Sequence, residues 1–150
     1  MTRFLIVFSL LFVFKATSQV ANQPVKWLFN YQSTNDTSGI IIITAEIEKD
    51  WHIYSINQSG DGPIATSIAF DEEDGYLLIG KIVEPEPKTL FSEVFAMEVK
   101  SFSDHAIFKQ RIHLKSVQLK QITGRLEFMA CTEFSCLPPK TIDFNITIKK

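Results

Sequence analysis

Two cysteines, Cys131 and Cys136, are the residues whose type and spacing most directly indicate chemistry, and they stand in the segment CTEFSCLPP (residues 131–139). Two thiols can form a disulfide or exchange electrons with the disulfide of another protein. They are too few for a structural zinc site, and no histidine stands at a ligand-like spacing from them. The histidines are His52, His105 and His113. We therefore expect thiol–disulfide chemistry without a metal, and no cysteine–histidine nucleophile pair.

A purely structural disulfide is the alternative interpretation of this pair. In the chain-entropy model, closing a loop of about six residues restricts the unfolded chain by about 2 kcal/mol, against about 4.7 kcal/mol for a loop of about 100 residues. A bond in a short loop also carries geometric strain more readily, which makes it easier to reduce. The spacing favours a disulfide that is made and broken in turn. A purely structural disulfide remains the alternative.

The amino terminus has the pattern of a secretory signal peptide. Arg3 gives it a basic start, residues 4–14 are apolar except for Ser9, and the small residues 16–18 precede Gln19. We expect a signal peptide over residues 1–18 and a soluble exported protein, in a compartment where disulfides persist. The apolar run is shorter than the roughly 20 residues that cross a bilayer. A retained membrane anchor is thus the weaker alternative, and no direct membrane insertion is expected.

Residues 19–150 have the size of one domain, with enough chain for a hydrophobic core that does not depend on a disulfide. Removing residues 1–18 takes away Arg3 and Lys15, which leaves 15 − 2 = 13 basic residues against 17 acidic ones. The resulting net charge of about −4 argues against nucleic acid or an anionic membrane as a partner.

Apolar and polar residues alternate with a period of two in several segments, which is typical of half-buried β-strands. The clearest segments are residues 41–48, 108–115 and 142–149, and further candidates are 25–31, 51–55, 66–70, 77–83 and 125–130. About eight short strands separated by turn-rich pieces, with no convincing helix, predict an all-β fold. The class we expect is an immunoglobulin-like antiparallel β-sandwich.

The same alternation predicts where the cysteines lie. Leu126 and Phe128 should face the core, so Cys131 falls on the opposite parity at the end of its strand. The double proline then separates Cys136 from the closing strand. We expect both sulfurs near the surface at one end of the sandwich, bonded or close enough to bond, where a partner protein can reach them.

Several motifs along the chain resemble a known family. They are DWHIYS (residues 50–55) with Gly62-Pro63, then Gly80 and Glu84, Phe95 before a strand at Phe102, and MAC (129–131) leading to CLPP (136–139). The chain thereby resembles, over nearly all of residues 19–150, the amino-terminal periplasmic domain of the DsbD family of thiol:disulfide interchange proteins. The resemblance implies an oxidoreductase of the protein-disulfide reductase type, without a cofactor. Such a domain takes electrons from a membrane electron transporter through a thioredoxin-like domain and passes them to oxidised periplasmic proteins.

The resemblance also implies roles for single residues. Cys136 corresponds to the attacking cysteine and Cys131 to the resolving one. Phe95, with Glu93 just before it, matches a loop whose phenylalanine covers the cysteines, and a plain core or edge aromatic is its alternative. Trp51, Tyr54 and Pro138 are expected to border the site, although for the two aromatic residues a simple core role is favoured.

Two departures from the family pattern affect the expectation. Full-length members continue into membrane helices and a thioredoxin-like domain, whereas this sequence ends at Lys150, so we expect its electron donor to be a separate protein. Some members also have five residues between the cysteines instead of four. Two other functional classes stay open: an immunoglobulin-like binding or adhesion module with an inert disulfide, and a subunit that supports assembly of an envelope complex.

Overall fold

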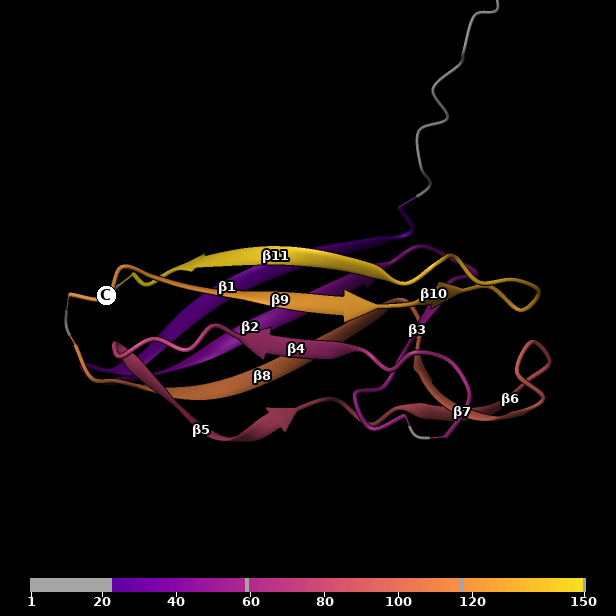
Figure 1. Ribbon diagram of the computed structural model, residues 1–150, viewed down its shortest axis with the longest axis horizontal. Coiled ribbons are helices and arrows are strands. Elements are labelled where there is room, and N and C mark those ends of the chain that lie inside the picture. The colour runs from indigo at the N-terminus through magenta and orange to yellow at the C-terminus, as the bar shows by residue number, and fades with distance from the viewer. Residues whose placement is uncertain (1–22, 59, 117, 150) are drawn as a thin grey trace, which may run out of the picture.

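The computed structural model describes residues 23–58, 60–116 and 118–149, and the expected signal peptide lies outside them (Figure 1). All regular structure in these residues is β-strand. The strands are β1 (Val25–Asn35), β2 (Ser38–Ile47), β3 (His52–Tyr54), β4 (Ser67–Phe70), β5 (Tyr76–Val83), β6 (Lys88–Ser92), β7 (Met97–Phe102), β8 (His105–Leu114), β9 (Gln121–Phe128), β10 (Ala130–Cys131) and β11 (Lys140–Thr147). Within the described residues, no helix is long and apolar enough to span a membrane.

The strands form three antiparallel sheets, in the orders β1-β2-β8-β5, β11-β9-β4 and β10-β3-β7-β6. Figure 1 shows the second sheet lying over the first, with the third at one end of the molecule. The all-β antiparallel sandwich expected from the sequence is therefore confirmed. The third sheet carries the cysteine segment, because β10 follows β9 after only Met129.

The main core lies between the first two sheets and is built by strands of period two. In β8, buried and exposed residues alternate along the whole strand, with Phe108 and Ile112 inside and Lys109 and Arg111 outside. Burying such side chains stabilises the fold by about 25 cal/mol per Å² of apolar surface removed from water. The third sheet contributes Ile53, Phe102 and Ala130 to this core from one face.

The opposite face of the third sheet carries a second, smaller apolar cluster. Its buried members are Tyr54, Val99 and Cys131, and the partly buried residues packed against them are Phe95, Met97, Met129 and Cys136. We call these seven residues the cysteine cluster. Because neighbouring residues of a strand point to opposite faces, the third sheet can serve the main core and this cluster at the same time.

A carboxylate holds the chain where it leaves β3. Glu84, just after β5, accepts hydrogen bonds from the Ser55 hydroxyl at 2.5 Å, the Ile56 amide at 2.9 Å and the Asn57 side-chain amide at 2.6 Å. Hydrogen bonds to a charged acceptor are the stronger kind in proteins. This network fixes the strand that brings His52 and Tyr54 next to the cysteines.

The period-two pattern did not identify the hairpin formed by β6 and β7. Leu90 and Phe91 are consecutive apolar residues, and they are 44% and 58% exposed. A strand whose two faces are both partly exposed has no reason to alternate. The hairpin was therefore not visible as a pair of strands, apart from the segment at Phe102 that the family resemblance indicated.

Candidate functional site

A disulfide joins Cys131 and Cys136, whose Cα atoms are 4.0 Å apart. The two residues face each other as an isolated antiparallel bridge. On either side of it, the Leu137 amide donates to the Ala130 carbonyl at 2.9 Å and the Thr132 amide donates to the Ser135 carbonyl at 2.8 Å. The cysteines thus occupy the non-hydrogen-bonded position of a hairpin, where opposed side chains come closest. The prediction that the sulfurs can bond without backbone rearrangement is confirmed.

The expectation that both sulfurs lie near the surface was wrong for Cys131. This residue is only 1% exposed, whereas Cys136 is partly exposed. Cys131 does lie on the opposite parity from Leu126 and Phe128, as the alternation predicted. The opposite face is covered, however, because the β6–β7 hairpin packs Phe95 and Met97 into the cysteine cluster. The alternation of residues along one strand cannot reveal that another hairpin covers one of its faces.

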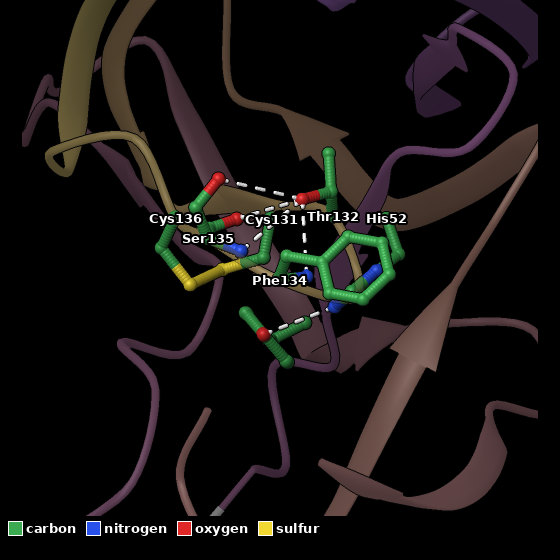
Figure 2. The surroundings of a disulfide bond; sticks show 7 residues. His52, Cys131, Thr132, Phe134, Ser135 and Cys136 are labelled. Atoms are coloured by element: carbon green, nitrogen blue, oxygen red, sulfur yellow. Dashed lines mark hydrogen bonds between the residues drawn. A yellow bond between two sulfur atoms is a disulfide. The ribbon is translucent and has the colours of Figure 1, made fainter. Parts of the chain in front are cut away.

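The loop between the cysteines is organised by Thr132 (Figure 2). Its hydroxyl oxygen accepts hydrogen bonds from the amides of Phe134 at 3.3 Å and Ser135 at 3.2 Å. This is a local turn of the kind that threonine forms after a strand. The turn presents Phe134 at the tip, where it is 88% exposed. Sequence reasoning missed both residues, although threonine next to a cysteine in a tight loop was an available signal.

Phe95 lies on the turn between β6 and β7 and reaches the cysteine cluster. Its ring meets that of Tyr54 edge-on, with ring centroids 6.2 Å apart. The turn spans residues 93–96 and closes with Ala96 in the left-handed region at a φ of 51°. Glu93, on the same turn, is exposed. The turn thus brings one aromatic ring inward and leaves one carboxylate at the surface.

The other expected border residues lie in different surroundings. Tyr54 is fully buried in the cysteine cluster. Trp51 packs against the main core. Pro138 is exposed and lines an apolar pocket of about 350 Å³ together with Phe128 and Leu137. Of the three, Tyr54 is thus the one whose side chain belongs to the cluster that holds both cysteines.

A cleft of about 660 Å³ lies between the cysteine loop, the β6–β7 hairpin and the start of β3. Exposed apolar side chains line it, with Phe134 from the loop and Leu90 and Phe91 from the hairpin. Its charged lining residues are Lys49, Asp50, Glu93, Asp104 and Glu133. The cleft is therefore apolar in part and predominantly acidic in charge.

His52 also lines this cleft, directly opposite Cys131 in the pairing of β3 with β10. Its Nε2 atom lies 3.1 Å from the Tyr54 hydroxyl. Burial lowers the pKa of His52, and the negative charge of Glu133 opposes that shift. Burial raises the pKa of Tyr54 to about 12. At neutral pH the imidazole is therefore mostly neutral and the phenol keeps its proton.

Comparison with solved structures establishes the kind of sandwich. The N-terminal periplasmic domain of ScsB from Proteus mirabilis superposes with a TM-score of 0.57 at 18% identity, covering 86% of this chain and 48% of that one. The chain thus spans about half the length of that ScsB domain. The reduced DsbD N-terminal domain of Neisseria meningitidis gives a TM-score of 0.55 at 16% identity and covers 84% and 86% of the two chains. The fold is the immunoglobulin-like fold of these domains.

A third structure is a complex between the N-terminal domains of DsbD and PilB from Neisseria meningitidis, with a TM-score of 0.51, 13% identity and coverage of 79% and 80%. No curated protein matches the chain. The family model described as "Thiol:disulfide interchange protein DsbD, N-terminal" matches residues 19–148. The chain therefore belongs to the family of DsbD N-terminal domains.

Proposed function

We propose that this chain is a periplasmic thiol:disulfide interchange domain, which relays electrons through the pair Cys131 and Cys136. Its donor is a thioredoxin-like protein that is itself supplied by a membrane electron transporter, and its acceptors are oxidised periplasmic proteins. Membership of the DsbD family and the bonded cysteine pair support this function. The periplasmic location of the related ScsB domain supports the compartment.

The observation that carries the proposal is the unequal exposure of the two cysteines. Exchange starts when a thiolate attacks a disulfide and forms a mixed disulfide, so the attacking sulfur must be reachable. Cys136 is partly exposed, and Cys131 is 1% exposed. Cys136 therefore attacks the partner's disulfide and releases one partner thiolate. Cys131 then attacks the Cys136 sulfur, restores the internal disulfide and releases the second partner thiolate.

The cleft beside the disulfide is suited to dock the partner. Phe134 and Phe91 offer exposed aromatic surface in the cleft that the cysteine loop lines, and aromatic residues often dominate binding energy at protein interfaces. The acidic lining favours a partner with basic residues around its own cysteines, because charge complementarity steers association. The DsbD N-terminal domain of Neisseria meningitidis forms a complex with the PilB N-terminal domain, which gives a precedent for docking in the family.

Phe95 acts as a cover in this proposal. It packs on the cluster that holds both cysteines, from a turn at the end of an exposed hairpin. A partner that docks against the hairpin can displace the turn and expose the disulfide. Reactivity is then linked to docking.

Trapping of the mixed disulfide tests the roles of the two cysteines. The test protein is thioredoxin with its resolving cysteine replaced by alanine and its remaining cysteine activated as a mixed disulfide with thionitrobenzoate. This supplies the disulfide that the attacking thiolate needs, with thionitrobenzoate as the leaving group. Complexes are detected by non-reducing electrophoresis. Cys131→Ala should accumulate a covalent complex, because the attacking Cys136 remains and nothing resolves the bond. Cys136→Ala should accumulate little complex, because the remaining thiol is buried.

Two outcomes would contradict parts of the proposal. Equal trapping by both variants would refute the assignment of roles and leave the redox function standing. No trapping by either, together with a wild-type disulfide that resists millimolar glutathione, would favour an immunoglobulin-like binding module with a structural disulfide.

A further inference from the structure

Resolution of the mixed disulfide releases a proton inside the molecule. Cys131 must lose its thiol proton as it attacks Cys136, yet Cys131 is 1% exposed. Apolar surroundings raise the pKa of a buried thiol and make it inert. Solvent has little access to this proton. Fast resolution therefore needs a base next to Cys131.

His52 is the titratable side chain that the sheet register places against Cys131. The two residues are directly opposed on β3 and β10, and opposed side chains share one face with Cβ atoms about 4.5–5.5 Å apart. His52 lines the cleft and is partly exposed, whereas Cys131 is buried. The contact of His52 with the Tyr54 hydroxyl orients the ring, and Tyr54 belongs with Cys131 to the cysteine cluster.

We propose that His52 is the base that accepts the Cys131 proton in the resolving step, an inference that rests on the proposed function. The Cys131 S–H bond breaks and its proton moves to the imidazole. The sulfur's electron pair forms the bond to Cys136, and the bond between Cys136 and the partner's sulfur breaks, with its electron pair leaving on the partner's thiolate. The imidazolium then passes the proton to water in the cleft.

The charges around His52 fit this role. Burial lowers the pKa of His52, so that the neutral form able to accept a proton predominates at neutral pH. Glu133 stabilises the imidazolium that forms. Tyr54 cannot replace His52 as the base, because burial raises its pKa to about 12. The other charged residues that line the cleft are Lys49, Asp50, Glu93 and Asp104.

A single turnover of the full chain with oxidised glutathione tests the inference. Reduced protein is mixed with the probe and quenched in acid, and mass spectrometry separates the glutathione adduct from the internal disulfide. His52→Gln keeps a group that can hydrogen-bond to Tyr54 but cannot accept the proton. His113→Gln, on the exposed face of β8, is the matched control. We expect the adduct to resolve roughly 100-fold more slowly in His52→Gln, the usual scale of general-base catalysis, and at the wild-type rate in His113→Gln.

Two further readouts distinguish a base from a structural residue. The wild-type resolving rate should be nearly level above pH 6.5 and should fall as acid protonates His52 at its lowered pKa. In His52→Gln the rate should instead rise about tenfold per pH unit until the thiol ionises. In His52→Ala, added imidazole should restore resolution, because it supplies the missing base.

Equal resolving rates in wild type and His52→Gln would overturn the inference. A slow His52→Gln with the wild-type pH profile, together with a His52→Ala variant that imidazole does not rescue, would overturn it as well, because the residue would then act only through structure. A wild-type protein that forms neither adduct nor disulfide, even after prolonged incubation with excess oxidised glutathione, would refute the proposed function itself. Normal wild-type turnover with unaffected variants would leave the proposed function standing.

Discussion

Reduction of the Cys131–Cys136 disulfide should leave the domain folded and should lower its free energy of unfolding by only about 2 kcal/mol. The bond joins residues five positions apart, so it closes a loop of about six residues. In the chain-entropy model, the corresponding loss of unfolded-state entropy is about 7 cal/mol/K, or about 2 kcal/mol at 25 °C. The main core contains neither cysteine. The contribution of the main core to the free energy of unfolding should therefore survive reduction.

Urea denaturation followed by tryptophan fluorescence, with and without dithiothreitol, measures this difference. For a domain of this size, about 2 kcal/mol corresponds to a fall of about 8 °C in Tm. The double variant Cys131→Ala with Cys136→Ala is the control, because its stability should not respond to the reductant. The denaturant m-value should be nearly the same in both redox states, since nearly the same surface is exposed on unfolding.

A reduced form that is unfolded at 25 °C, or a loss above about 5 kcal/mol, would refute this reasoning. The bond would then be holding together structure that the main core alone cannot keep. Such a result would also weaken the proposed function, because a domain that cycles between two redox states must stay folded in both.

Two further predictions concern the surroundings of the disulfide. Phe95→Ala should speed alkylation of the reduced thiols several-fold while costing less than the roughly 3–5 kcal/mol of a buried Phe→Ala change, because Phe95 is only partly buried. Phe91→Ala, at the exposed position on the same hairpin, is the control, and unchanged alkylation with a large fall in Tm would identify Phe95 as core. His52 should make the fold less stable in acid, because its folded-state pKa lies below the ordinary value of 6.5. As the pH falls through 6.5, the unfolded chain therefore binds a proton before the folded chain does. The free energy of unfolding then decreases until the pH has passed the folded-state pKa. Urea unfolding at pH 7.5 and 5.5 should show a smaller difference for His52→Gln than for wild type, and an equal difference would refute this contribution.

The sequence was sufficient to predict the β-sandwich, because the long strands bury one face and expose the other. β2, β8 and β11 alternate so regularly that period two identifies them without other information. In the β6–β7 hairpin, β6 has no such pattern, since it is an exposed edge strand of its sheet. The position of Phe95 came from family resemblance, because nothing in the local sequence specifies which distant cluster a hairpin turn will reach.

The site was predictable in its cysteine pair and less so in its surroundings. The spacing of Cys131 and Cys136 indicated a disulfide, and the structure contains it. The burial of Cys131 and the position of His52 depend on the pairing of β10 with β3, which joins segments about 80 residues apart in the sequence. Cross-strand partners over such a distance follow from the register of the whole fold. Local spacing could therefore give no reason to connect His52 with either cysteine.

In the proposed exchange, the surroundings of the cysteines imply that the partner controls their reactivity. Low thiol pKa values arise at helix amino termini or beside basic groups, whereas this pair lies in a β-hairpin next to Glu133 and an acidic cleft. The thiolate is therefore not stabilised in the free domain, and Cys131 is shielded from solvent. Small oxidants should react slowly with the reduced pair. A docked partner that displaces the Phe95 turn and brings basic groups to the cleft would favour the thiolate at the moment of transfer, which couples electron flow to recognition.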